Sequence, residues 1–244
     1  MTGLPDTTRV RLPRRWLLYR FRWFGRWVIR RRYRVRLHTT EQVPSTGPVI
    51  FCSNHIGVAD GPLLAVFAPR PVHALTKEDM FRGAAGPFLH AAGQIPLHRD
   101  GADPDAIKSC VKVLREGLAV GLYPEGTRGP GDYEVFHHGA AYLAMVTGAP
   151  VVPVAMFGSR EPRGSRNSLP PRGATIDMVF GPAFTTAQVP WPRRREHVAA
   201  VSALLREHLL DHLAHAREQT GRELPGPLPG ATAVPTPVLD QGAS

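Results

Sequence analysis

The 244-residue sequence has few cysteines and no long apolar run, and both absences exclude classes of protein. Cys52 and Cys110 are its only cysteines, too few for a disulfide framework, and neither belongs to a C-x-x-C pair. The longest stretch free of charged residues and histidine, 139–159, is interrupted by Gly148, Pro150 and Pro153. It therefore predicts a helix, a turn and a strand rather than a membrane-spanning helix. A content of 43% hydrophobic and 20% charged residues is typical of a globular chain and excludes a disordered or polytopic one.

Acidic residues are almost absent from the first 40 positions. That segment contains twelve arginines and one acid, Asp6, for a net charge of +11, whereas the rest of the chain carries about −1. The basic character is confined to one segment, which argues against a protein that coats nucleic acid with its whole surface. Arginines also interrupt the apolar residues throughout positions 1–36, so no secretory signal is expected. With so few cysteines, we expect a cytoplasmic protein.

Residues 14–30 have the pattern of an amphipathic helix. One stripe of it is basic and consists of Arg15, Arg22, Arg26 and Arg30. Aromatic side chains lie beside and opposite this stripe, among them Trp16, Trp23 and Trp27, although Arg20 interrupts the apolar face. We expect residues 1–36 to bind an anionic membrane surface, the inner face of the cell membrane, with rings at headgroup level and guanidinium groups on lipid phosphates. A helix that covers the domain's own core fits the same pattern, and the two roles are compatible.

Residues 37–220 alternate between short apolar runs and helical patterns. The expected strands cover 48–53, 72–76, 95–97, 119–123, 151–157 and 175–180. The expected helices cover 62–67, 81–92, 104–116, 139–147 and 196–218. This order predicts an α/β fold: a single domain with a mixed, largely parallel central sheet flanked by helices, preceded by the basic N-terminal helix. Residues 221–244 hold five prolines and four glycines with little apolar periodicity, which predicts a disordered tail.

His55 and Asp60 follow the expected strand 48–53, at a position where α/β folds place active-site residues. On a regular helix the two side chains would lie on different faces, so they meet only if the residues between them are not helical. In that case Asp60 accepts a hydrogen bond from one imidazole nitrogen and leaves the other as a general base. A structural histidine followed by an N-capping aspartate fits the same residues.

Four segments, in order, match the blocks of a known family. Residues 54–60 fit N-H-x4-D, residues 93–99 fit G-x-I-x-x-x-R, residues 123–128 fit F-P-E-G-T-R with Tyr123 for Phe, and residues 151–154 fit a proline-centred block. The chain resembles the glycerolipid acyltransferases of the 1-acylglycerol-3-phosphate acyltransferase type over roughly residues 35–185.

The resemblance implies an acyl transfer without a protein nucleophile. His55 would deprotonate the free hydroxyl of a 1-acylglycerol-3-phosphate, with Asp60 orienting the imidazole, and the hydroxyl would attack the thioester of acyl-CoA or acyl carrier protein to give phosphatidic acid. The sequence also lacks a G-x-S-x-G elbow, an H-E-x-x-H zinc motif and a G-x-x-x-x-G-K-[ST] phosphate loop. No metal and no cofactor beyond the acyl donor are expected.

By the same resemblance, Arg99 and Arg128 would hold the acceptor phosphate. Glu125 would pair with one of these arginines or bind the glycerol, Gly126 would allow close backbone approach, and Thr127 belongs to the same block. Lys77 fits a common family segment and would assist phosphate or donor binding, although a solvated lysine at a helix start fits equally well.

Some features leave alternatives open. His137 and His138 stand where many family members have a lysine pair, which leaves the acceptor headgroup undecided among lysophosphatidic acid, glycerol-3-phosphate, another lysophospholipid and a glycolipid. Residues 191–195, Trp-Pro-Arg-Arg-Arg, fit a loop that touches lipid headgroups or coenzyme A phosphates, or a solvated lead into a helix. A histidine stripe fits a transition-metal site or, more simply, the boundary of a packed helix: His208, His212 and His215.

Two remote interpretations are not catalytic. A nucleic-acid-binding arm would use the arginines of residues 1–40 on phosphates, but a stripe of tryptophans suits lipid better than a groove, so no nucleic acid is expected. A degenerate lipid-binding module would not need the His55 and Asp60 pair that this chain retains.

Overall fold

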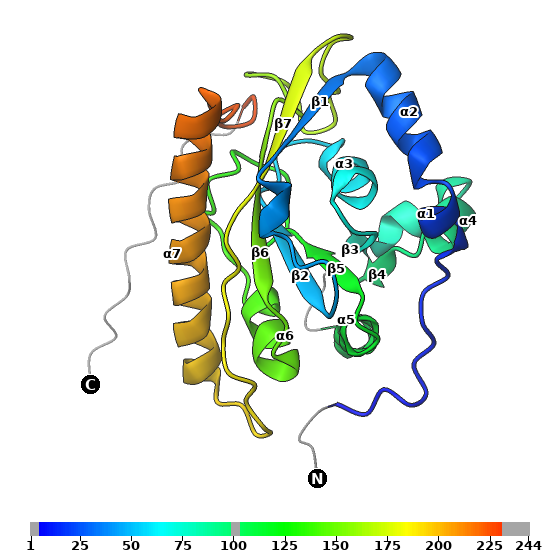
Figure 1. Cartoon of the computed structure of the whole chain (residues 1–244), viewed down its shortest axis with the longest axis vertical. Helices are drawn as coiled ribbons and strands as arrows, with labels where there is room; N and C mark the ends of the chain where they lie inside the picture. The colour runs from blue at the N-terminus through cyan, green and yellow to red at the C-terminus, as the bar shows by residue number, and fades with distance from the viewer. Residues whose placement is uncertain (1–4, 99–102, 231–244) are drawn as a thin grey trace.

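A seven-stranded sheet forms the centre of the molecule in the computed structural model, which describes residues 5–98 and 103–230 (Figure 1). The strands are β1 (Arg34–His38), β2 (Val49–Ser53), β3 (Val72–Lys77), β4 (Ile95–Leu97), β5 (Ala119–Leu122), β6 (Val151–Phe157) and β7 (Thr175–Phe180). They lie in the order β1-β7-β6-β2-β5-β3-β4. Every neighbouring pair is parallel except β6 and β7. The prediction of a mixed, largely parallel sheet is confirmed.

Helices cover both faces of the sheet because the central strands are apolar on both sides. In β2, Ile50 and Cys52 belong to the core under α5 (Pro104–Arg115), α6 (Gly139–Thr147) and α7 (Arg195–Thr220). Val49 and Phe51 belong to the core on the opposite face, under α2 (Arg22–Arg32) and α3 (Asp60–Phe67). All five strand residues of β2 are buried, which matches the uninterrupted apolar run of that segment.

The expected N-terminal helix is two helices, α1 (Trp16–Arg20) and α2, which meet at Phe21. The bend lets α1 contact α4 (Ala85–Ala91) while α2 lies along α3. Two short 3-10 helices, η1 (Thr40–Gln42) and η2 (Glu78–Phe81), complete the elements of the described residues. The expected helix over 81–92 is shorter, because η2 and α4 are separated by a turn at Gly83, whose φ of 63° is left-handed.

The inner side of α2 is held to α3 by arginines. The Arg22 and Arg26 guanidinium groups both donate hydrogen bonds to the carbonyls of Val66 and Ala68, with Arg26 Nε 2.8 Å from the Val66 oxygen. These carbonyls end α3, where four backbone acceptors lack helical partners and the helix dipole is negative. Burial lowers the pKa of Arg22 to about 10. Two arginines expected on lipid phosphates therefore bind the domain itself.

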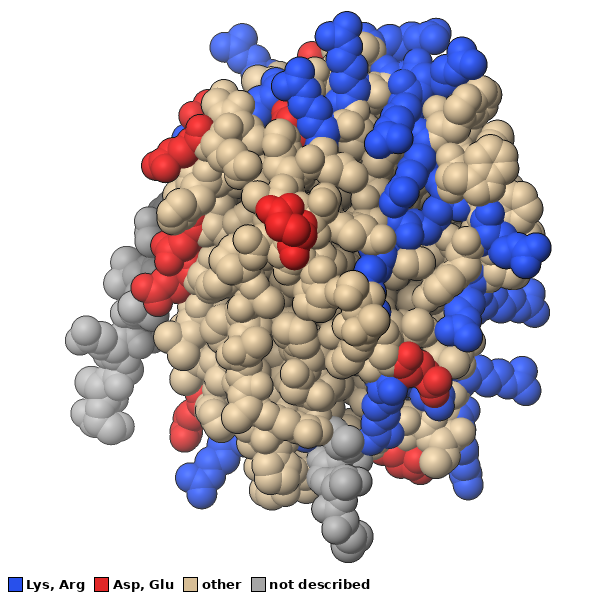
Figure 2. All heavy atoms as spheres, viewed as in Figure 1, with Lys and Arg blue, Asp and Glu red and all other residues tan. Residues whose placement is uncertain are grey.

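The outer side of α1 and α2 is aromatic. Trp16, Trp23 and Trp27 are more than half exposed, and the Phe24 ring stacks on Trp27. Basic side chains gather on the same side of the molecule (Figure 2). Within residues 5–98 and 103–230, no helix combines the length and the apolar character needed to cross a bilayer.

The start of the expected tail is packed on the domain. Pro225 is buried, the Gly226 carbonyl accepts from Arg160 Nη2 at 2.6 Å, and Arg222 Nε donates to Asp177 Oδ2 at 2.9 Å. Residues 222–226 thus contact the sheet and its loops. The rest of that segment, 231–244, lies outside the described residues.

Replacement of Arg22 by methionine is expected to loosen α2. It removes charge-assisted hydrogen bonds to Val66 and Ala68, so the free energy of unfolding should fall by about 1–3 kcal/mol. Hydrogen exchange of the α2 amides should also become faster. The matched control is Arg20→Met, because Arg20 is exposed in the same segment. Equal losses of stability in both variants would contradict this role of Arg22.

Candidate active site

The histidine and aspartate of the first block meet in the loop between β2 and α3. His55 Nδ1 lies 2.8 Å from Asp60 Oδ2, and residues 54–59 between the strand and the helix are not helical. The expected condition for their contact is therefore met. Asp60 is the first residue of α3 and does not serve as its N-cap, because its carboxylate is turned back into the loop. With Nδ1–H donating to Asp60, the lone pair of His55 Nε2 is left for another partner.

The Asp60 carboxylate is fully buried and has four hydrogen-bond donors. Oδ2 accepts from His55 Nδ1 and from the backbone N–H groups of Ile56 and Gly57, at 2.7 and 2.8 Å for the last two. Oδ1 accepts from the Ser159 hydroxyl. A buried charge is tolerated when hydrogen bonds replace its hydration, and here they fix both the carboxylate and the imidazole.

Ser159 and its neighbour Arg160 were missed as site residues in the sequence. Arg160 is 2% exposed, and its guanidinium donates to four carbonyls, those of Ile56, Gly129, Gly164 and Gly226. It therefore ties the His55 loop to the loop after Glu125. The signal was present: both residues follow the end of β6, and β2, β5 and β6 are parallel neighbours whose carboxyl ends share one edge.

The third block lies against the imidazole. The Tyr123 ring stacks on His55 with centroids 4.1 Å apart, and the Tyr123 hydroxyl is buried without a hydrogen-bond partner among the described residues. Glu125 Oε1 accepts from the His55 backbone N–H at 2.8 Å. Burial raises the pKa of Glu125 to about 8, from an ordinary value of 4.5. Glu125 thus supports the histidine loop rather than pairing with Arg128.

The remaining candidate residues lie around the same loop. Gly126 has a left-handed φ of 68°, which favours glycine, and a Cβ there would displace the exposed His137 ring, 2.7 Å away. Arg128 Nη1 donates to Asn167 Oδ1 at 2.7 Å, and Thr127 is exposed beside it. Lys77 forms an ion pair with Asp79. Arg99 lies outside the described residues.

His55 lines a cavity of about 1950 Å³. Its floor is the carboxyl edge of the sheet, because residues at the ends of β2, β3 and β5 line it: His55, Lys77 and Tyr123. Gly126, Thr127 and Arg128 line it too. Most of the lining surface is apolar, which suits a ligand with a hydrocarbon part.

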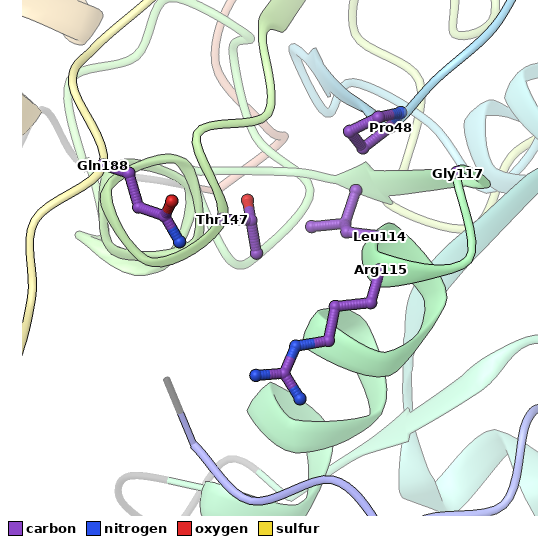
Figure 3. Close-up of a pocket in the computed structure, with 6 residues that line it drawn as sticks. All are labelled: Pro48, Leu114, Arg115, Gly117, Thr147 and Gln188. Carbon is purple, nitrogen blue, oxygen red and sulfur yellow. The ribbon is translucent and has the colours of Figure 1, made fainter. Parts of the chain in front are cut away.

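A second, small pocket of about 200 Å³ lies at the opposite, amino edge of the sheet (Figure 3). It is formed by residues that precede β2 and β5 or end α5 and α6, including Pro48, Gly117 and Thr147. Figure 3 shows the Arg115 side chain at its rim, and Arg115 Nη1 donates to Thr7 Oγ1 at 2.6 Å. None of the described residues of the four blocks lines this pocket.

The histidine stripe of α7 is used in packing. His208 and His212 each have a ring nitrogen within 3.0 Å of a carbonyl of the β7 region, and His215 Nδ1 lies 2.8 Å from the Asp211 carbonyl. In the part of the chain that the structure describes, no group of three or more His, Cys, Asp or Glu residues could hold a metal ion. The stripe is the boundary of a packed helix.

Comparison with known proteins identifies relatives of this arrangement. Residues 34–157 match the family model described as Acyltransferase. A 1-acyl-sn-glycerol-3-phosphate acyltransferase of Bacillus subtilis (strain 168) is 28% identical over 177 residues, which are 72% of this chain and 86% of that protein. One of Borreliella burgdorferi is 32% identical over 128 residues, 49% of this chain and 50% of that protein.

A solved structure is similar in fold. The crystal structure of the 1-acyl-sn-glycerophosphate (LPA) acyltransferase PlsC from Thermotoga maritima superposes with a TM-score of 0.60 and 19% sequence identity, over 84% of this chain and 80% of that one. The family match extends from β1 to the end of β6 and so contains His55, Asp60 and Glu125. Because it covers just over half of the sequence, this protein belongs to the Acyltransferase family.

Proposed function

We propose that this acyltransferase moves a fatty acyl group from a thioester donor, acyl-CoA or acyl carrier protein, to the free hydroxyl of 1-acylglycerol-3-phosphate. The product is phosphatidic acid, a precursor of phospholipids. The observation that carries the proposal is the position of the His55 imidazole. It is bound by the Asp60 carboxylate, which accepts four hydrogen bonds, and it lines a large, mainly apolar cavity. The names of the B. subtilis and B. burgdorferi relatives support the choice of acceptor.

The His55–Asp60 pair suits general base catalysis. Nδ1–H donates to Asp60, so Nε2 takes the proton of the acceptor hydroxyl as its oxygen attacks the thioester carbonyl. The tetrahedral intermediate then expels the thiolate, which receives the same proton from the imidazolium. Asp60 stabilises the imidazolium, and Ser159 and the Ile56 and Gly57 amides keep that carboxylate in place.

The acceptor phosphate needs positive charge near the reacting hydroxyl. Arg128 lines the cavity and supplies it; Lys77, which pairs with Asp79, lines the cavity as well. Glu125 would repel the phosphate if it were ionised. With its pKa raised to about 8, it is mostly neutral at pH 7 and does not.

The aromatic side of α1 and α2 is suited to the membrane that holds both lipids. Phe21, Phe24 and Val28 lie at the cavity wall as well as on the exposed helix face. Insertion of this face at headgroup depth would bring the cavity to the lipid, with the arginines not bound to α3 on anionic headgroups.

Replacement of His55 by alanine is expected to abolish acyl transfer. Loss of the general base should lower kcat by about 10²–10⁴-fold, and Asp60→Asn should do nearly the same by releasing the imidazole. The assay follows phosphatidic acid by mass spectrometry from oleoyl-CoA and lysophosphatidic acid in anionic vesicles. His197→Ala is the control, since His197 is exposed on α7. Full activity of His55→Ala would refute the mechanism. If the wild type transferred the acyl group to another acceptor and not to lysophosphatidic acid, the proposed acceptor would be wrong.

The raised pKa of Glu125 predicts a pH-dependent stability. Between pH 4.5 and about 8 the native carboxyl keeps a proton that the unfolded chain loses, so its contribution to stability falls as pH rises through this window. Glu125→Gln removes this titration. The free energy of unfolding of wild type, relative to Glu125→Gln, should therefore decrease between pH 5.5 and 8.5 in urea denaturation. Exposed Glu134→Gln should show no such trend, and a flat difference for Glu125→Gln would contradict the burial argument.

Membrane binding is expected to depend on the exposed tryptophans. The Trp23→Ala/Trp27→Ala variant should bind anionic vesicles at least tenfold more weakly in a sedimentation assay, because interfacial burial of both rings is lost. Leu204→Ala, which also truncates a side chain that is 56% exposed but lies on α7, should bind as wild type does. Unchanged binding of the double variant would show that the membrane contact does not depend on these two tryptophans.

A further inference from the structure

The guanidinium of Arg160 is buried where four segments of the chain meet. The residue is 2% exposed, and the hydrogen-bond acceptors of its guanidinium are four backbone carbonyls. They are those of Ile56 at 2.7 Å from Nε, Gly164 at 2.9 Å from Nη1, and Gly129 and Gly226 at 3.0 and 2.6 Å from Nη2. Because the guanidinium is planar and rigid, it fixes these carbonyls relative to one another.

Two of the four carbonyls belong to the backbone around His55. Ile56 follows His55 directly; its N–H donates to Asp60 Oδ2, and its carbonyl accepts from Arg160. Gly129 donates its N–H to the His55 carbonyl at 2.8 Å and accepts from Arg160 with its own carbonyl. Arg160 therefore holds two residues that are bonded to His55 or hydrogen-bonded to its backbone. The direction of the imidazole depends on this backbone.

The segment 222–226, which follows α7, supplies another of the four carbonyls and has its own anchors on the domain. Arg222 Nε donates to Asp177 Oδ2, on β7, at 2.9 Å. The Leu224 side chain packs against the core cluster under α5, α6 and α7. These contacts keep the Gly226 carbonyl within reach of the buried guanidinium.

A packing contact links the same segment to the His55 loop, residues 54–59. Gly131 lies between Leu224 and Ile56: a Cβ added to this glycine would lie 3.5 Å from Leu224 Cδ2 and would overlap the Ile56 side chain. The turn that contains Gly131 thus fits between the segment and the loop because it carries no side chain there. Displacement of segment 222–226 would loosen this packing and remove one hydrogen bond of the guanidinium.

Neither segment 222–226 nor Arg160 lines the large cavity, whereas His55 does. A direct contact with a substrate held in that cavity is therefore not their role. Their contacts reach the imidazole through the backbone of Ile56 and Gly129.

We propose that segment 222–226 is a positioning element of the active site, which acts through Arg160 to hold the His55 loop. This inference rests on the proposed role of His55 as general base. The segment fixes the backbone that directs Nε2 toward the acceptor hydroxyl, so its release leaves the substrates bound but the reacting groups misaligned. Small misplacements of reacting groups lower the rate of the chemical step strongly.

The test weakens the anchors of the segment in the full chain, in the variants Arg222→Met and Leu224→Ala. In the first, Asp177 keeps its contact with His38 Nε2 at 2.9 Å, so folding should be retained. Arg172→Met is the control, because Arg172 is an exposed arginine between β6 and β7. In transfer from oleoyl-CoA to lysophosphatidic acid, each segment variant should lower kcat about tenfold with both KM values nearly unchanged. The control should match the wild type. Each assay is run well below the melting temperature of the variant.

Two further measurements separate positioning from stability. Amide hydrogen exchange of Ile56 and Gly57 should be faster in Arg222→Met than in Arg172→Met, with exchange in β2 unchanged. Arg160→Lys keeps the charge but not the planar fork, and should itself lower kcat at least about tenfold. Because the segment acts through Arg160, the double variant Arg160→Lys/Arg222→Met should be no slower than Arg160→Lys alone.

Other results would overturn the assignment. Lower melting temperatures of Arg222→Met and Leu224→Ala with unchanged kcat would make the segment purely structural, and raised KM values with unchanged kcat would give it a part in substrate binding. Multiplied losses in the double variant would show that it does not act through Arg160.

The proposed function and the positioning role can fail separately. If the wild type transferred no acyl group to lysophosphatidic acid, the proposed function would fail, and the exchange of the Ile56 and Gly57 amides would decide the positioning role. Normal transfer by the wild type and by both segment variants would refute the positioning role and leave the reaction standing.

Discussion

The buried Asp60 carboxylate is the constraint on which the rest of the site depends. An isolated charge at zero exposure is costly, so the protein surrounds it with four donors drawn from two distant segments, residues 55–57 and Ser159. Those donors fix the path of the loop after β2 and bring the end of β6 against it. The orientation of the His55 imidazole is therefore set by the position at which these donors hold the Asp60 carboxylate. Arg160 reinforces the same arrangement from the other side by holding the Ile56 carbonyl.

Because of the sheet topology, the site around His55 is open to both faces of the sheet. Since β2, β5 and β6 are parallel neighbours, the connections that leave their carboxyl ends meet at one edge, and a cavity that crosses this edge opens on both faces. The two faces carry different helices. On one, α2 is bound to α3 by arginines that turn inward, and this leaves its rings facing out. On the other, α5 and α6 bring basic groups to the rim. One edge of the sheet thus faces an apolar side and a more polar side.

The sequence predicted six of the seven strands almost to the residue because each is a short apolar run bounded by glycine, proline or a polar residue, and the burial pattern of β2 shows why. It did not predict β1, in which arginines alternate with apolar residues. It also predicted the contact of His55 with Asp60, on the condition of a non-helical loop. It did not predict the bend at Phe21, which depends on what α1 and α2 pack against. Nor did it predict that Arg22 and Arg26 bind the end of α3, because a helical wheel shows which residues share a face but not which residues that face contacts. Ser159 and Arg160 were hidden in a polar loop, since their partners lie about 100 positions away.

The four carbonyls that Arg160 binds belong to residues 56, 129, 164 and 226, so they become available in succession as the chain leaves the ribosome. A nascent chain that ends before Gly226 lacks one of the two carbonyls to which Arg160 Nη2 donates. The full set of hydrogen bonds that joins these loops therefore forms only after the chain has been synthesised as far as Gly226.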